Sequence, residues 1–175
     1  MDVTPASAVH SARKTGPYLE MSVGLSQTGA IRMDGRTDCW GAGGSQAIGH
    51  PHYRQSAVAP SLVDTGGTAF GQIAAGNAHT CQVLRDGTLS CWGSDTTGQA
   101  IPPPGLFAQV ANGETHSCAI AGGNGSVTCW GADMPGTFGS PATSDRFRRR
   151  ALGPQGISCG LKADGSAQCW HPVLG

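Results

Sequence analysis

Apolar residues along this 175-residue chain fall in short runs, and glycine-centred turns separate most of these runs. In the middle of the chain, Gln72–Ala75 is long enough for one short strand. Thr80–Arg85 and Thr88–Trp92 then form a hairpin pattern around Asp86-Gly87, because both turn residues tolerate a positive φ angle. The apolar spacing of about 3.6 residues that paired-helix repeats require is absent from the sequence. The pattern predicts an all-β unit of strand, tight turn, hairpin and loop, with a short fourth strand near Gly98–Ala100 as an alternative.

This unit is repeated about four times along the chain. The stretches FGQIAAGNAHTC from Phe70 and FAQVANGETHSC from Phe107 are nearly identical and begin 37 residues apart. A Cys-Trp pair ends each copy, with successive spacings of 52, 38 and 40 residues. A turn pair precedes each Cys-Trp, at Asp34-Gly35, Asp86-Gly87, Asn124-Gly125 and Asp164-Gly165. A hairpin unit that recurs about every 40 residues is typical of a β-propeller blade.

The spacing divides the chain into four propeller repeats of three to four antiparallel strands. Their expected boundaries are residues 18–69, 70–106, 107–146 and 147–171, between short tails at 1–17 and 172–175. Four blades can close a small ring. The first and fourth copies depart most from the pattern, however, so a partial or open propeller is predicted. An open arc exposes strand edges, and self-association through those edges is then expected.

The residues from Ala74 to Gln99 carry a longer signature. It places a histidine three residues after a glycine, Asp-Gly in the hairpin turn, Trp-Gly after the last strand and Gly-Gln at the end. This signature resembles the repeat of the regulator of chromosome condensation family. The Cys-Trp-Gly ending and the linker Pro103–Phe107 are similar to the short, cysteine-bearing form found in bacterial proteins and plant receptor kinases. The resemblance implies a β-propeller, and it adds two alternative functions: guanine-nucleotide exchange with chromatin association, and a carbohydrate-binding or receptor-ectodomain role.

Six of the seven cysteines form pairs that face one another across the predicted hairpins. Directly opposed residues of antiparallel strands lie within the range that a disulfide accepts. The expected disulfides are Cys81–Cys91, Cys118–Cys129 and Cys159–Cys169, whereas Cys39 faces Gly29 and is predicted to be a free thiol. Buried reduced cysteines and a metal site are the alternatives, although closely spaced cysteine knuckles are absent. The histidines before Cys81 and Cys118 are interpreted as groups that brace the turn through the backbone.

Composition limits the functional classes. Eleven Lys and Arg residues balance eleven Asp and Glu residues, and a formal net charge of zero argues against a nucleic-acid binder. No apolar run approaches the roughly 18 residues of a membrane span. Paired cysteines favour an oxidising compartment, so an extracellular or cell-surface location is predicted. The opening MDVTPASAVHSARKTG shows no secretory signal, which keeps a cytoplasmic location as the alternative.

The candidate functional residues are contact residues, because no catalytic or cofactor motif is recognisable and no cofactor or metal is predicted. The tryptophans could stack on a ligand but are assigned to the blade core, since each follows a cysteine: Trp40, Trp92, Trp130 and Trp170. Propeller loops vary while the blades repeat, so the loops are the expected contact surface. The candidate partner contacts are His52, Tyr53, Phe138, Arg148 and Arg149. The predicted function is a non-catalytic, disulfide-braced scaffold for an unidentified protein partner.

Overall fold

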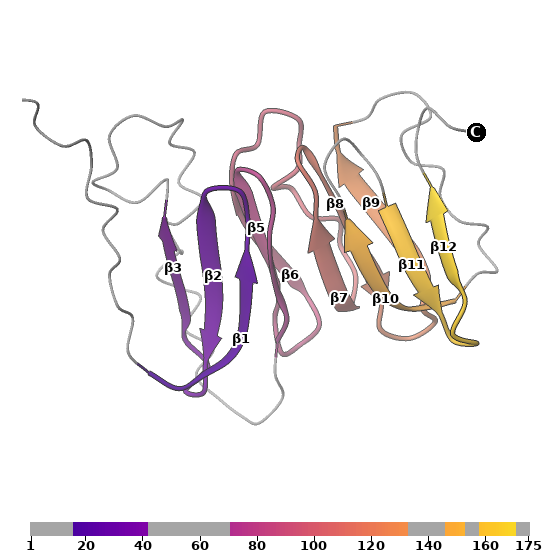
Figure 1. Cartoon of the computed structure of the whole chain (residues 1–175), viewed down its shortest axis with the longest axis horizontal. Helices are drawn as coiled ribbons and strands as arrows, with labels where there is room; N and C mark the ends of the chain where they lie inside the picture. Colours follow the sequence, from indigo (N-terminus) through magenta and orange to yellow (C-terminus); the bar gives the residue numbers. More distant parts are fainter. Residues whose placement is uncertain (1–15, 42–70, 133–145, 153–157, 171–175) are drawn as a thin grey trace, which may run out of the picture.

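The fold is seen in a computed structural model that describes residues 16–41, 71–132, 146–152 and 158–170. These residues form four three-stranded antiparallel sheets that follow one another along the long axis of the molecule (Figure 1). The strands are β1 (Tyr18–Val23), β2 (Gln27–Arg32), β3 (Thr37–Gly41), β4 (Ile73–Ala75), β5 (His79–Val83), β6 (Leu89–Gly93), β7 (Phe107–Asn112), β8 (His116–Ala121), β9 (Val127–Gly131), β10 (Phe147–Leu152), β11 (Ser158–Lys162) and β12 (Ala167–Trp170). The predicted all-β fold of propeller-like blades is confirmed.

Each sheet is a meander in which consecutive strands pair, and we number the sheets blade 1 (β1–β3) to blade 4 (β10–β12). The predicted strand and hairpin of blade 2 correspond to β4, β5 and β6 within one or two residues. The alternative of a fourth strand near Gly98–Ala100 is wrong, because that segment is a turn. There Gly98 donates to the carbonyl of Asp95, and Ile101 donates to the carbonyl of Gly98. The backbone groups are therefore used within the loop and do not extend the sheet.

The hairpin turns all use the same local chemistry. The turn glycines Gly35, Gly87, Gly125 and Gly165 have φ angles of 82°, 85°, 69° and 88°, a region that L-residues with side chains rarely occupy. The Asp or Asn before each glycine accepts a hydrogen bond from the backbone N–H two residues further on, at 2.8–3.1 Å. In blade 3 the extra residue lengthens the turn, and β8 and β9 pair without a register shift. The predicted Asp-Gly and Asn-Gly pairs thus lie in the hairpin turns.

Disulfides connect the second and third strands of three blades. Cys81–Cys91, Cys118–Cys129 and Cys159–Cys169 are directly opposed pairs, with Cα atoms 4.0–4.1 Å apart. These are the three pairs that the sequence indicates. In blade 1 the same cross-strand position pairs Gly29 with Cys39, and Cys39 is a free, half-buried thiol. Each of the three disulfides therefore braces a single blade, and blade 1 has none.

The glycine three residues before each repeated histidine has a steric role. A Cβ built on Gly113 would lie 2.4 Å from Cε1 of His116, and one on Gly76 would lie 2.8 Å from Cε1 of His79. Successive turns also touch through the backbone, because Asn77 donates to the carbonyl of Gly113 at 3.2 Å. A side chain at either glycine would force the imidazole away and separate neighbouring blades.

The hydrophobic core lies between blades. The largest buried cluster joins blade 2 to blade 3 and contains Ala74, Cys81, Val83, Phe107, Val110 and Ala119, with Leu89, Cys91 and Trp130 packed against it. Hydrogen bonds reinforce the same joint: Val110 donates its N–H to Oε1 of Gln72, and Asn112 donates Nδ2–H to the carbonyl of Ala74. Stability therefore depends on stacking, as in other repeat proteins.

The tryptophans occupy the margin of this core. Trp40, Trp92 and Trp130 are half-buried, whereas the central strand β5 carries fully buried residues such as His79, Thr80 and Cys81. All three lie on the third strand, at the edge of a sheet, which leaves part of each side chain uncovered. Trp130 packs against the core cluster, and the assignment of the other tryptophans to the blade core stays a prediction. The side chain of Trp170 lies outside the described residues.

Candidate binding surface

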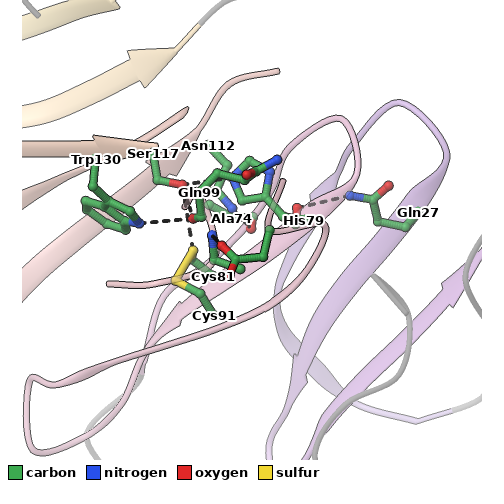
Figure 2. Close-up of a disulfide and its surroundings, with 11 residues drawn as sticks. Gln27, Ala74, His79, Cys81, Cys91, Gln99, Asn112, Ser117 and Trp130 are labelled. Atoms are coloured by element: carbon green, nitrogen blue, oxygen red, sulfur yellow. Dashed lines mark hydrogen bonds between the residues drawn. A yellow bond between two sulfur atoms is a disulfide. The ribbon is translucent and has the colours of Figure 1, made fainter. Parts of the chain in front are cut away.

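A buried polar network crosses the joint between blades 2 and 3 (Figure 2). Nε2 of His79 lies 2.8 Å from the hydroxyl oxygen of Ser117, and both side chains are fully buried. Ser117 donates its hydroxyl hydrogen to the carbonyl oxygen of Gln99, so it accepts from Nε2–H of His79. The interpretation of this histidine as a turn brace that hydrogen-bonds the backbone between strands is therefore wrong, because its ring bonds a side chain. Its ring instead connects two blades, which the sequence could not show because Ser117 is 38 residues away.

The loop that follows β6 is anchored to the same network. The carbonyl of Gln99 also accepts the indole N–H of Trp130 at 3.0 Å, and the Gln99 side chain donates to Ser94. Thr97 donates its hydroxyl hydrogen to the carbonyl of Thr115 on the next blade. Gln99 is 2% exposed, so this loop is held at its base by buried polar contacts. The Gly-Gln ending of the second repeat thus has a structural role.

Blade 1 carries glutamine where blades 2 and 3 carry histidine. Gln27 donates Nε2–H to the carbonyls of Gly76 and His79, at 2.9 and 3.1 Å (Figure 2). Two further bonds join blades 1 and 2: Ser22 accepts from the N–H of Ala75, and Thr37 lies 2.7 Å from Oε1 of Gln82. The joint between blades 1 and 2 is therefore also fixed by side chains that reach across it.

The buried histidine has the electrostatics of a structural group. Burial, assisted by the neighbouring His116 ring, lowers the pKa of His79 to about 4. A neutral imidazole that is buried and hydrogen-bonded to Ser117 cannot reach a substrate as a general acid or base.

The surroundings of the free thiol disfavour its thiolate form. Burial, with a smaller contribution from the carboxylate of Asp38, raises the pKa of Cys39 to about 12. Nucleophilic cysteines have a lowered pKa, because the thiolate is the reactive form. Among the described residues there is also no group of three His, Cys, Asp or Glu side chains that could hold a metal ion.

The predicted partner contacts are only partly visible. His52, Tyr53 and Phe138 lie outside the described residues. Arg148 is exposed near the start of β10, where the pairing with β11 shifts register. Arg149 follows it in β10, opposite Leu161. The structure thus places the two arginines on a strand rather than in a loop.

Two exposed aliphatic side chains that the sequence did not single out flank a proline-rich linker. Ile101 and Leu106 are 65% and 63% exposed, at the two ends of the proline-rich linker 102–105 that follows the anchored Gln99. Apolar side chains that are held in the open by a buried anchor form a pre-organised contact surface. We call the segment Ser94–Leu106 the anchored loop. The signal in the sequence is the proline run beside two large aliphatic residues.

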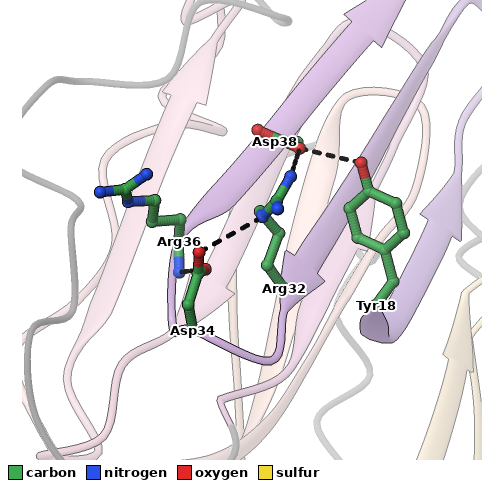
Figure 3. Close-up of polar contacts among 5 residues, drawn as sticks. All are labelled: Tyr18, Arg32, Asp34, Arg36 and Asp38. Carbon is green, nitrogen blue, oxygen red and sulfur yellow. Dashed lines mark hydrogen bonds and ion pairs between the residues drawn. The ribbon is translucent and has the colours of Figure 1, made fainter. Parts of the chain in front are cut away.

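A polar cluster covers part of blade 1 (Figure 3). Asp38 accepts a hydrogen bond from the hydroxyl of Tyr18 at 2.9 Å and forms an ion pair with Arg32 at 3.4 Å. Arg32 also contacts Asp34 at 3.5 Å and lies over the Tyr18 ring. The hydrogen bond to Asp38 raises the pKa of Arg32, which stays cationic. Arg32 is thus shared between two carboxylates of the same blade.

Four stacked three-stranded meanders define a β-propeller-type repeat protein. Residues 72–99 match the Regulator of chromosome condensation (RCC1) repeat family. The resemblance seen in the sequence is thereby confirmed, and the chain carries a repeat of this family. Among the described residues, no helix is long and apolar enough to cross a bilayer.

Curated relatives share parts of this sequence. The chain is 24% identical over 167 positions to the Serine/threonine-protein kinase-like protein CCR2 of Arabidopsis thaliana, covering 82% of this chain and 20% of that protein. It is 26% identical over 84 positions to the X-linked retinitis pigmentosa GTPase regulator homolog of Caenorhabditis elegans, covering 48% of this chain and 6% of the relative. The chain thus spans a fifth or less of these relatives.

Solved structures show the same fold. The CRINKLY WD40 ectodomain of the Arabidopsis thaliana receptor kinase ACR4 is 25% identical, with a TM-score of 0.64 over 89% of this chain and 50% of that one. The ectodomain of the Physcomitrella patens receptor kinase CR4 is also 25% identical, with a TM-score of 0.67, and 39% of it is covered. Prp20p from Saccharomyces cerevisiae is 16% identical, with a TM-score of 0.66 over 92% of this chain and 47% of that chain. The chain spans half or less of these structures.

Proposed function

We propose that this protein is a non-catalytic scaffold that binds a protein partner through loops held by disulfide-braced propeller blades. The observation that carries the proposal is that cysteine and histidine side chains of the described residues are used inside the fold. Six cysteines are in disulfides, His79 is buried against Ser117, and the pKa of Cys39 is raised. Such a frame leaves recognition to the surface.

The anchored loop is the partner contact that the geometry favours. Gln99 fixes its base, and Ile101 and Leu106 present apolar surface on either side of the prolines. Prolines limit the conformations of the free loop, so less entropy is lost when a partner binds. Aliphatic side chains held in this way suit an apolar pocket or groove on another protein.

The disulfides and the similar structures together support an extracellular or cell-surface location. The chain has three disulfides. Disulfides form and persist in oxidising compartments. Two solved structures that are 25% identical to the chain are receptor-kinase ectodomains from plants. An extracellular or cell-surface scaffold accounts for both findings better than an exchange factor, which belongs to the nucleus or cytoplasm.

A non-reducing pull-down tests the proposed contact. The immobilised chain is compared with the double variant Ile101→Asp/Leu106→Asp and with Met33→Asp, a control at an equally exposed apolar residue on a hairpin turn. We expect the native chain and the control to retain the same protein, and the double variant to retain at least about tenfold less of it, as for loss of a central apolar contact.

Two results would contradict the proposal. Equal recovery by the double variant would remove the anchored loop as the contact. Faster nucleotide release from a small GTPase on addition of the chain would replace the scaffold function with exchange activity.

A further inference from the structure

The joint between blades 2 and 3 consists of two complementary faces. Blade 2 contributes its tail face, which comprises Cys81, Val83, Leu89 and Cys91. Blade 3 contributes its head face, which comprises Phe107, Val110, Ala119 and Trp130. The two faces together make up most of the largest buried apolar cluster, so this joint defines what each side of a blade is built to contact.

The same positions can be followed through the repeat. At the position of Val110, blade 2 carries Ile73, and both are 2% exposed. A Cβ on Gly29 of blade 1 would lie 2.6 Å from Cδ1 of Ile73, so this side chain also points at the preceding blade. Blade 1 carries Met21 at this position, and Met21 is 55% exposed. The face of blade 1 that corresponds to a joint is therefore open at Met21, whereas Ala30 on the same face is fully buried.

At the opposite end of the row, the tail face of blade 4 is exposed. Val83 and Ile120 are 5% and 3% exposed, whereas Leu161, at the same position in blade 4, is 39% exposed. Cys81 and Cys118 are fully buried, but Cys159 is half-buried and its partner Cys169 is exposed. Blades 1 and 4 form the two ends of the row of sheets (Figure 1).

Each end of the row corresponds to one half of the joint between blades 2 and 3. The head face of blade 1 comprises Tyr18, Met21, Ala30 and Trp40, and the tail face of blade 4 comprises Cys159, Leu161, Ala167 and Cys169. The Tyr18 and Trp40 rings are already in contact, at 6.2 Å between centroids. The polar rim of this head face is satisfied within its own blade, because Arg32 pairs with Asp38 (Figure 3). Asp38 therefore keeps an ion-pair partner within its own blade when the face is covered.

We propose that the head face of blade 1 binds the tail face of blade 4 of a second copy of this chain. The contact repeats the joint between blades 2 and 3, with Met21 in the place of Val110 and Leu161 in the place of Val83. Because the two faces differ, the contact is heterologous, and two copies can satisfy both ends only by closing on each other.

The number of blades is compatible with a closed pair, because two copies together contribute eight three-stranded sheets. A closed ring of eight blades lies within the range known for propellers, roughly four to eight.

Light scattering during size-exclusion chromatography tests the proposal on the full chain. We expect the native chain to run with the mass of two chains at micromolar concentration, and Met21→Glu or Leu161→Glu to run with the mass of one. Met33→Glu places the same change at a methionine that is 63% exposed on the hairpin turn, and it should stay a pair. The circular dichroism spectrum of each variant confirms that it is folded.

Mixing the variants separates a head-to-tail contact from any other. Met21→Glu keeps a native tail face and Leu161→Glu keeps a native head face, so their mixture should recover a two-chain species through one intact joint. A native chain that stays single, or a mixture that stays single, would overturn the proposal. Pairing that Met21→Glu abolishes but Leu161→Glu leaves intact would also overturn it, because the contact would then be head to head.

Discussion

At the scale of single residues, glycine and histidine work as one unit in the inner turns. Gly113 has no side chain because the His116 ring occupies that space, and Gly76 stands in the same relation to His79. The His79 ring reaches Ser117 on the next blade. The spacing of glycine and histidine is visible in the sequence, but its purpose is not, because the partner of the ring belongs to another repeat.

His79 should make stability depend on pH. Its pKa is about 4 in the folded protein and near 6.5 when unfolded. Between these values the unfolded chain binds a proton that the folded chain does not, so the free energy of unfolding falls as the pH falls below about 6.5. At about pH 5 the expected loss is on the order of 2 kcal/mol.

Urea unfolding at about pH 7 and pH 5 measures this loss, with His79→Gln as the matched variant. Blade 1 already uses Gln27 at this position, so glutamine retains hydrogen-bonding groups without a titrating ring. A hydrogen bond from Thr88 lowers the pKa of Asp86. Carboxylates of this kind are present in both proteins, so they contribute equally to the pH dependence of both. The variant should lose less stability on acidification than the native chain, and equal losses would show that His79 does not titrate with unfolding.

At the scale of the strand and hairpin, the sequence is a reliable guide. Asp-Gly and Asn-Gly fix the turns through a positive φ angle, and the alternation of strand residues then sets the cysteines opposite one another. Both effects act within about a dozen residues, so they could be read locally. The alternative of a fourth strand at Gly98–Ala100 was wrong because the backbone of this segment forms hydrogen bonds within turns and to the indole of Trp130.

The missing disulfide of blade 1 can be restored by a paired substitution. Gly29 faces Cys39, and a Cβ at Gly29 would lie 3.5 Å from the Cys39 sulfur but 2.6 Å from Cδ1 of Ile73. Valine lacks that atom, and Val110 is the residue that packs beside Cys81 in the next joint. We expect Gly29→Cys/Ile73→Val to close a fourth disulfide and to stabilise the chain by up to about 3 kcal/mol.

Thiol titration under denaturing conditions and urea unfolding measure the two effects. The double variant should show no free thiol, where the native chain shows one. Ile73→Val alone is the control for lost packing and should cost about 1 kcal/mol. Two free thiols in the double variant would mean that blade 1 does not place positions 29 and 39 face to face.

At the scale of the whole molecule, the stacking of blades determines which blade faces are buried, and the sequence does not predict this. The number of repeats and the antiparallel meander follow from the period, but the joint faces do not. Met21 and Val110 occupy equivalent positions, yet their exposure differs from 55% to 2% because a blade covers one of them and not the other. Aligning the copies shows which positions correspond, while the structure shows which of them are covered. The expected self-association is thereby moved from strand edges to the end faces, where it remains a proposal.

Peptide mapping by mass spectrometry under non-reducing conditions tests most directly that the chain is a row of separately braced blades. The structure predicts three linked peptide pairs, Cys81 with Cys91, Cys118 with Cys129 and Cys159 with Cys169, and an alkylated thiol at Cys39. Bridges between cysteines of different blades, or seven alkylated cysteines in the chain purified without reductant, would contradict it.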